Sequence, residues 1–123
     1  MAQKHNPGFQ ALVNDAKTRV TEIDVEQYKA MVADGTPHVL VDVREDNEFA
    51  EGHVRGAVHL SKGVIERDVE TQIPDKSAKL VLYCGGGFRS ALVADNLLKM
   101  GYTQAISLDG GWRALKESGI AVE

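Results

Sequence analysis

The sequence has 123 residues, of which 43% are hydrophobic and 26% are charged, and its formal net charge is −4. These values are typical of one soluble globular domain, and they give no reason to expect nucleic-acid binding. The single cysteine excludes an internal disulfide, and no apolar run is long enough for a signal peptide or a membrane span. We therefore expect a cytoplasmic protein that needs no metal or cofactor and has no nucleic-acid or membrane partner.

Helical and extended patterns alternate along the chain. Apolar residues at helical spacing predict a first helix over about 8–19, and Asp24, with Gln27 three residues on, is a typical N-cap of a second helix ending at Gly35. Short apolar runs predict buried strands at 38–43, 79–84 and 104–108, with weaker patterns at 56–60 and, at a sheet edge, at 19–23. Further helices are expected near 45–51, 64–72, 88–100 and 111–118.

This alternation predicts an α/β fold of three layers, in which helices cover both faces of a central parallel β-sheet. The first helix precedes the main pattern, so we expect an N-terminal helical extension over residues 1–18 and one domain over 19–123. In such folds the chemistry lies beyond the carboxyl ends of the strands. Cys84 stands at that end of the predicted strand 79–84.

The residues after Cys84 are typical of an anion-binding loop. Gly85, Gly86 and Gly87 can take positive φ angles, which lets successive backbone N–H groups point inward. A helix that begins near residue 88 or 89 adds unpaired N–H groups and the positive end of its dipole. These features predict a cup with the sulfur at its floor, which favours the reactive thiolate. Arg89 would supply a fixed charge at the rim and Ser90 a hydroxyl donor.

Several interpretations of this loop are open at the level of the residues. A lone cysteine at the end of a buried strand is often an inert small hydrophobic residue. If Cys84 is reactive, the loop suits phosphate-ester cleavage, thiol redox chemistry or sulfur transfer through a persulfide. Redox chemistry with a resolving cysteine is disfavoured because the chain has no second cysteine.

Three segments of the sequence carry a resemblance to a known family, in which similar segments occur in the same order. They are "LVDVREDNEFAEGHVRGAVHLS" (40–61), "LVLYCGGGFRSALVADNLLKMGY" (80–102) and "SLDGGWRAL" (107–115). With them the chain resembles the rhodanese family of sulfurtransferase-like domains from about Val20 to Ala121. The resemblance implies a single-domain rhodanese-like fold over 19–123. It also implies that Cys84 is the nucleophile and carries sulfur from a donor such as thiosulfate to a thiol, cyanide or a sulfur-accepting protein. The substrate-binding cradle would be formed by Gly85, Gly86, Gly87, Phe88, Arg89 and Ser90.

The resemblance also ranks the alternatives. The phosphatase-like branch of this fold has five residues between cysteine and arginine, whereas Cys84 and Arg89 enclose four. The smaller loop suits a sulfur atom better than a phosphoryl group, so sulfur transfer is favoured over a phosphatase or arsenate reductase. A non-enzymatic persulfide carrier or partner-binding module remains the main alternative.

Other residues of the matching segments are expected to support the site. Asp42 and Arg44 are interpreted as framework residues, with a smaller electrostatic role at the site. Glu48 stands where some two-domain members of the family carry a substrate-contacting arginine, and we expect it to pair with Arg44 or to cap the short helix near 45–51. That glutamate counts against thiosulfate as the physiological donor.

Four further side chains have structural interpretations. His53 and His59 are expected to be scaffold residues, because no third or fourth metal ligand lies near them. Asp109 is expected to cap the helix near 111–118, and Trp112 to anchor it in the interior. Phe88 is assigned equally to core packing and to an apolar wall of the pocket.

Overall fold

The strands form one parallel sheet, whose order places the strand before Cys84 at the centre. In this computed structural model, which describes residues 5–123, the sheet order is β1-β5-β4-β2-β3 and every neighbouring pair is parallel. The strands are β1 (Thr21–Ile23), β2 (Val39–Asp42), β3 (Val58–His59), β4 (Lys79–Tyr83) and β5 (Gln104–Leu108). Cys84 follows β4 directly and therefore lies at the carboxyl edge of the sheet.

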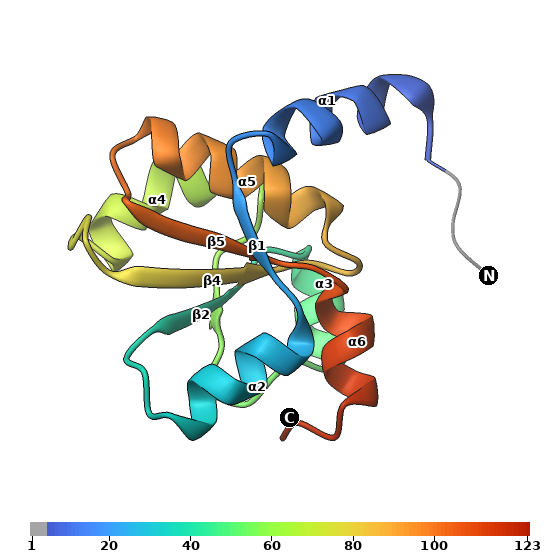
Figure 1. Cartoon of the computed structure of the whole chain (residues 1–123), viewed down its shortest axis with the longest axis vertical. Helices are drawn as coiled ribbons and strands as arrows, with labels where there is room; N and C mark the ends of the chain where they lie inside the picture. The colour runs from blue at the N-terminus through green and yellow to red at the C-terminus, as the bar shows by residue number, and fades with distance from the viewer. Residues whose placement is uncertain (1–4) are drawn as a thin grey trace.

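Helices cover both faces of this sheet, which confirms the predicted three-layer α/β fold (Figure 1). Helices α4 and α5 lie on one face and α2 and α6 on the other, while α1 lies against α5. The helices are α1 (Pro7–Lys17), α2 (Val25–Ala33), α3 (Asp46–Glu51), α4 (Ile65–Gln72), α5 (Phe88–Lys99) and α6 (Gly111–Glu117). None of the helices within residues 5–123 combines the length and apolar character that crossing a membrane requires.

All the predicted helices and strands are present, with ends that differ by at most two residues. Asp24 and Gln27 form the expected capping box at the start of α2. The edge strand predicted at 19–23 is β1, which pairs with β5. The strand predicted at 56–60 shrinks to the two residues of β3, because Gly56 adopts a φ of +84° in a turn that the Ala57 N–H closes on the Val54 carbonyl.

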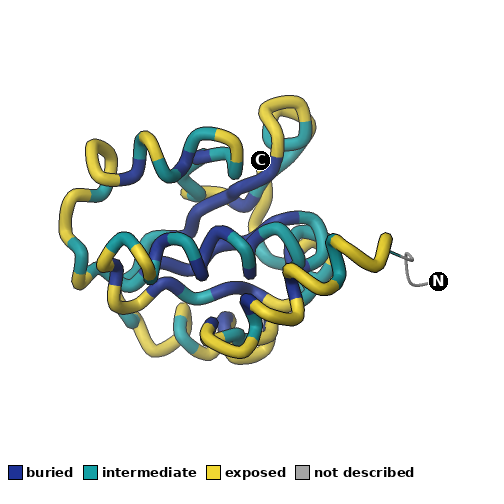
Figure 2. The backbone as a smooth tube through the Cα atoms, turned by 90° about the horizontal axis from the view of Figure 1, so that it is seen from above, coloured by how far each residue is buried: buried dark blue, intermediate teal, exposed yellow. Residues whose placement is uncertain are grey.

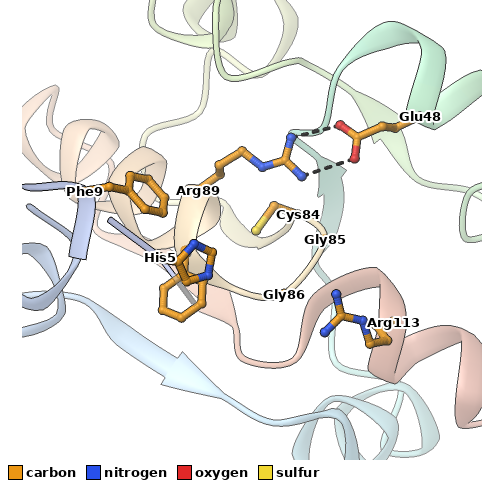
Figure 3. A pocket seen from close by; sticks show the side chains of 9 residues that line it. His5, Phe9, Glu48, Cys84, Gly85, Gly86, Arg89 and Arg113 are labelled. Atoms are coloured by element: carbon orange, nitrogen blue, oxygen red, sulfur yellow. Dashed lines mark hydrogen bonds and ion pairs between the residues drawn. The ribbon is translucent and has the colours of Figure 1, made fainter. Parts of the chain in front are cut away.

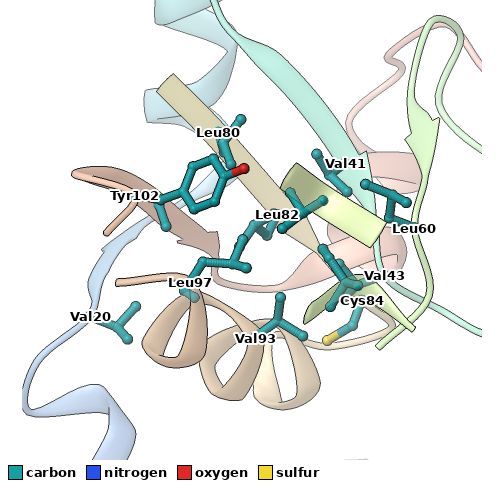
Figure 4. Close-up of a cluster of buried hydrophobic side chains, with 14 residues drawn as sticks. Val20, Val41, Val43, Leu60, Leu80, Leu82, Cys84, Val93, Leu97 and Tyr102 are labelled. Carbon is teal, nitrogen blue, oxygen red and sulfur yellow. The ribbon is translucent and has the colours of Figure 1, made fainter. Parts of the chain in front are cut away.

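Alternate residues of β4 serve the two cores. Leu80, Leu82 and Cys84 face the core beneath α4 and α5 (Figure 4), whereas Val81 and Tyr83 face the core beneath α2 and α6. All five are buried, and buried residues, in dark blue, predominate in the middle of the molecule in Figure 2. The strand is thus fixed on both sides, and the thiol is held at its end by packing as well as by the backbone ladder.

The N-terminal helix α1 is docked onto α5. Its apolar residues Val13 and Ala16 are buried. Beyond its end, the Arg19 guanidinium donates from Nε and Nη2 to the two carboxylate oxygens of Asp95 on α5, each at 2.8 Å. The predicted boundary at residues 18 and 19 falls between α1 and β1.

Candidate active site

Cys84 lies on the wall of a cavity of about 490 Å³ at the carboxyl edge of the sheet (Figure 3). The thiol side chain is only 1% exposed, so the sulfur is nearly desolvated although it borders this space. The lining residues come from the loop after β4, the N-terminal segment, α3, α5 and α6: His5, Phe9, Glu48, Cys84, Gly85, Gly86, Phe88, Arg89 and Arg113.

The sulfur has two polar neighbours from its own loop. The Gly87 N–H donates to Sγ at 3.1 Å, and the thiol donates to the Ser90 hydroxyl oxygen at 3.5 Å. Ser90 Oγ lies 2.9 Å from Ser107 Oγ on β5, and both serines are fully buried. The hydroxyl behind the sulfur is therefore fixed by a second hydroxyl, and the loop supplies one backbone donor to the thiol.

The three glycines of the loop have different tasks. Only Gly87 has a positive φ, of +106°, and it forms the N-cap of α5. A Cβ at Gly85 would lie 3.2 Å from Arg89 Nη2, whereas a Cβ at Gly86 would meet nothing within 4 Å. The expected curl at successive glycines is therefore confined to Gly87, which brings its N–H onto the sulfur.

The first turn of α6 holds the loop from behind. The Trp112 N–H donates to the Cys84 carbonyl at 2.7 Å, and the Arg113 N–H donates to the Gly85 carbonyl at 3.3 Å. The predicted cap at Asp109 is wrong: Gly110 is the N-cap, with no capping side chain, because loop carbonyls satisfy these N–H groups. Trp112 packs at the edge of the core beneath α6 and is partly exposed.

Arg89 is held by Glu48, which corrects the predicted pair between Glu48 and Arg44. The guanidinium donates to the two Glu48 oxygens at 2.9 and 3.2 Å, and Glu48 also accepts from the Glu45 N–H, the expected cap of α3. The hydrogen bonds with Arg89 lower the pKa of Glu48, and those with Glu48 raise the pKa of Arg89. The only side-chain cation of the loop therefore has a counter-ion within the cavity wall.

Asp42 and Arg44 form a separate buried pair outside the lining of this cavity. Arg44 Nη2 donates to Asp42 Oδ2 at 2.7 Å and to the Gly52 carbonyl at 2.7 Å, and the guanidinium carbon lies 4.6 Å from the centre of the Trp112 ring. The pair ties the end of β2 to the turn after α3 and to α6, and its supporting role at the site stays a prediction.

The two histidines of the 40–61 segment face a phenylalanine. His53 and His59 stack on Phe49 with centroid distances of 3.8 and 4.4 Å. Their ring nitrogens contact the backbone carbonyls of Phe49 and Arg44, respectively. Within residues 5–123, no cluster of potential ligand side chains could hold a metal ion.

Three residues that line the cavity were not predicted to belong to the site, namely His5, Phe9 and Arg113. Phe9 stood out only as one apolar residue of a helical pattern, and His5 belongs to no motif. Arg113 lies in the matching segment 107–115 but was given no role at the site. Phe88, for which core and pocket were weighed equally, lines the cavity and contacts both His5 and Phe9 through ring edges. Nothing local in the sequence indicates that the N-terminal segment folds back onto this loop.

Fold and site define a small α/β domain with a cysteine loop at the end of the central strand. A sequence model of the rhodanese-like domain matches residues 24–118. The chain therefore belongs to the rhodanese-like domain family. The matched range omits α1 and His5.

Known relatives and solved structures agree with this assignment. A sulfurtransferase of Allochromatium vinosum is 33% identical over 84% of this chain and 94% of its own length. The protein HIGH ARSENIC CONTENT 1, mitochondrial, of Arabidopsis thaliana is 32% identical over 95% of this chain and 75% of its own. A Rhodopseudomonas palustris protein of unknown function, described as a possible tyrosine phosphatase, superimposes with a TM-score of 0.85 at 27% identity, over 100% of this chain and 99% of its own. Family and relatives support a function of the sulfurtransferase type.

Gly111 provides a test of the contact between α6 and the loop. Its φ is +53°, and an added Cβ would collide with the Cys84 carbonyl oxygen and lie 2.8 Å from the Gly85 carbonyl carbon. We expect Gly111→Ala to lower the free energy of unfolding by about 2–3 kcal/mol, measured by urea denaturation. Gly63→Ala is the matched control, because a Cβ there meets nothing within 4 Å. Equal stability of the two variants would contradict the close approach.

Proposed function

We propose that the protein is a sulfurtransferase that carries a sulfane sulfur on Cys84 as a persulfide. The observation that carries this proposal is the position of the thiol, which directly follows the central strand β4, accepts a hydrogen bond from the Gly87 N–H and borders a cavity of about 490 Å³. Membership of the rhodanese-like family and the named sulfurtransferase relative support it.

In the first half-reaction the Cys84 thiolate attacks the outer sulfur of a donor such as thiosulfate. The new S–S bond forms as the donor's own S–S bond breaks, and sulfite leaves with the bonding electron pair. Cys84 then carries the added sulfur as Cys84–S–S⁻. The Gly87 N–H and the N-terminus of α5 provide a preorganised positive potential for this anion.

In the second half-reaction an acceptor removes the outer sulfur. A thiolate or cyanide attacks that sulfur, the S–S bond of the persulfide breaks, and the electron pair returns to Sγ of Cys84. The products are a new persulfide or thiocyanate and the regenerated thiolate. The cradle for donor and persulfide is assigned to the backbone of Gly85, Gly86, Gly87, Phe88, Arg89 and Ser90.

A phosphatase is the second candidate, because the similar Rhodopseudomonas palustris protein is described as a possible tyrosine phosphatase. A phosphoryl group would need the guanidinium of Arg89, but that group donates two hydrogen bonds to Glu48. A carboxylate at this position also repels a phosphate dianion. The geometry therefore favours sulfur transfer, and absence of hydrolysis of a chromogenic phosphate ester is the corresponding check.

The persulfide gives the most direct test of the proposal. Incubation with thiosulfate should add one sulfur, about 32 Da, to the wild-type protein, and mass spectrometry of peptides should place it on Cys84. Cys84→Ala should gain no mass and should lose at least about 10³-fold in transfer of sulfur to cyanide. Unchanged circular dichroism of this variant is the control. Transfer retained by a folded Cys84→Ala would exclude Cys84 as the carrier.

The same measurements separate the enzyme from a dedicated sulfur carrier. A carrier should acquire the persulfide but turn over thiosulfate and cyanide very slowly, even at high protein concentration. An enzyme should turn over repeatedly with small donors.

The Glu48–Arg89 pair predicts how the donor preference can be changed. Glu48→Gln removes one negative charge from the cavity wall, so binding of the thiosulfate dianion should improve and kcat/KM for thiosulfate should rise about 3- to 10-fold at low salt. Added salt should reduce this gain because it screens the partly exposed charge. Glu51→Gln, on the same helix but outside the lining of the Cys84 cavity, is the matched control. An equal response of the two variants would contradict the assigned role of Glu48.

A further inference from the structure

We infer that the N-terminal segment supplies an aromatic wall to this site and thereby favours organic thiols with an apolar body as sulfur acceptors. The aromatic wall consists of His5, Phe9 and Phe88. This inference rests on the proposed function, because it assigns the acceptor of that same site. It adds to the cysteine loop two residues that precede the matched family range 24–118.

The three rings of the aromatic wall contact one another and line the cavity. The ring centres of His5 and Phe88 are 4.2 Å apart, those of His5 and Phe9 5.3 Å, and those of Phe9 and Phe88 6.2 Å. In Figure 3 His5 and Phe9 lie on one side of the Cys84 sulfur, and Arg113 lies on the opposite side of the loop. An acceptor that approaches the sulfur from the cavity would pass along these rings.

The wall is fixed by more than ring contacts. Lys17 is the last residue of α1, and its Nζ atom lies 5.1 Å from the centre of the Phe88 ring. The same atom lies 3.3 Å from a carboxylate oxygen of Glu22. Val13 is fully buried beneath α1, and the Arg19–Asp95 pair holds the chain just after it. Phe9 therefore belongs to a docked helix, and its exposed part faces the site.

The size and charge of the cavity indicate the class of acceptor. A volume of about 490 Å³ lies in the range of sites for organic ligands, roughly 300–1,000 Å³, and far exceeds what a diatomic ion such as cyanide needs. Arg89, the cation on the same side of the cavity as the aromatic wall, is already paired with Glu48, so an inorganic ion gains little from the charge of Arg89, and Arg113 lies on the opposite side of the loop. Aromatic rings instead stabilise an apolar body through burial and ring–ring contact.

The transfer itself is the second half-reaction already described. The acceptor thiolate R–S⁻ attacks the outer sulfur of Cys84–S–S⁻, the S–S bond breaks, and the products are R–S–S⁻ and the Cys84 thiolate. Atoms and electrons balance without an oxidant or reductant. The aromatic wall contacts the R group, so its effect should appear only with an R group large enough to reach it.

Two alkanethiols that differ in the apolar body provide the test. With thiosulfate as donor, kcat/KM is measured for phenylmethanethiol and for 2-mercaptoethanol through the sulfite released. We expect Phe9→Ala and His5→Ala to lower the ratio of the two values about 3- to 10-fold, as the loss of one aromatic contact predicts. Leu12→Ala is the matched control, because Leu12 is 62% exposed on the same helix and is absent from the cavity lining. Its ratio should equal that of the wild type.

A second readout does not depend on sulfur transfer. Benzyl alcohol, which has the same ring but no thiol, should slow alkylation of Cys84 by iodoacetamide in the wild type and in Leu12→Ala, and should protect Phe9→Ala less. Equal loss for both thiols, or an unchanged ratio together with unchanged protection, overturns the inference. A wild-type protein that forms no persulfide but is protected by benzyl alcohol overturns the proposed function and leaves the aromatic wall as a binding site.

Discussion

The site depends on the two hydrogen bonds by which the first turn of α6 holds the carbonyls of Cys84 and Gly85. In a trans peptide unit the N–H points opposite to the C=O. Once Trp112 and Arg113 fix these carbonyls, the N–H groups of Gly85 and Gly86 must point away from α6. The same approach leaves no room for a side chain at Gly111. A backbone contact between two elements thus orients the loop whose amides the proposed chemistry uses.

This arrangement assigns the stabilisation of a sulfur anion to backbone dipoles more than to side-chain charge. Arg44 is paired with Asp42, and Arg89 with Glu48. Because each of these cations has a counter-ion, neither offers its full charge to a bound anion. The Gly87 N–H and the α5 dipole do not have such a competitor, and they act at short range on a nearly desolvated sulfur. In the proposed mechanism these dipoles, more than the paired side-chain cations, would stabilise the persulfide anion.

Features encoded by neighbouring residues were predictable from the sequence, and features that join distant segments were not. The buried strand before Cys84, the glycine at the helix start and the capping box at Asp24 depend on residues within one or two turns. The partner of Glu48 could not be predicted, because Arg89 and Arg44 are both cations and only the path of α3 decides between them. The cap expected at Asp109 failed for a related reason. The first N–H groups of α6, which a capping side chain would otherwise bind, donate to loop carbonyls 28 residues earlier in the chain, those of Cys84 and Gly85. His5 and Phe9 reach the site only through the docking of α1.

The docking of helix α1 matters for the proposed function because the thiol of Cys84 is buried. Cys84 is 1% exposed, so an acceptor must enter the cavity and leave most of its hydration shell before it reaches the sulfur. For a small, strongly hydrated ion, Arg89 offers little compensation for this desolvation, because its guanidinium is already paired with Glu48. For an organic thiol the same loss of water is favourable along the apolar body, and Phe9 and Phe88 provide the surface that replaces it. In the proposed function, the aromatic rings beside one buried sulfur would thus favour organic acceptors through burial of their apolar body, a contribution that does not depend on charge.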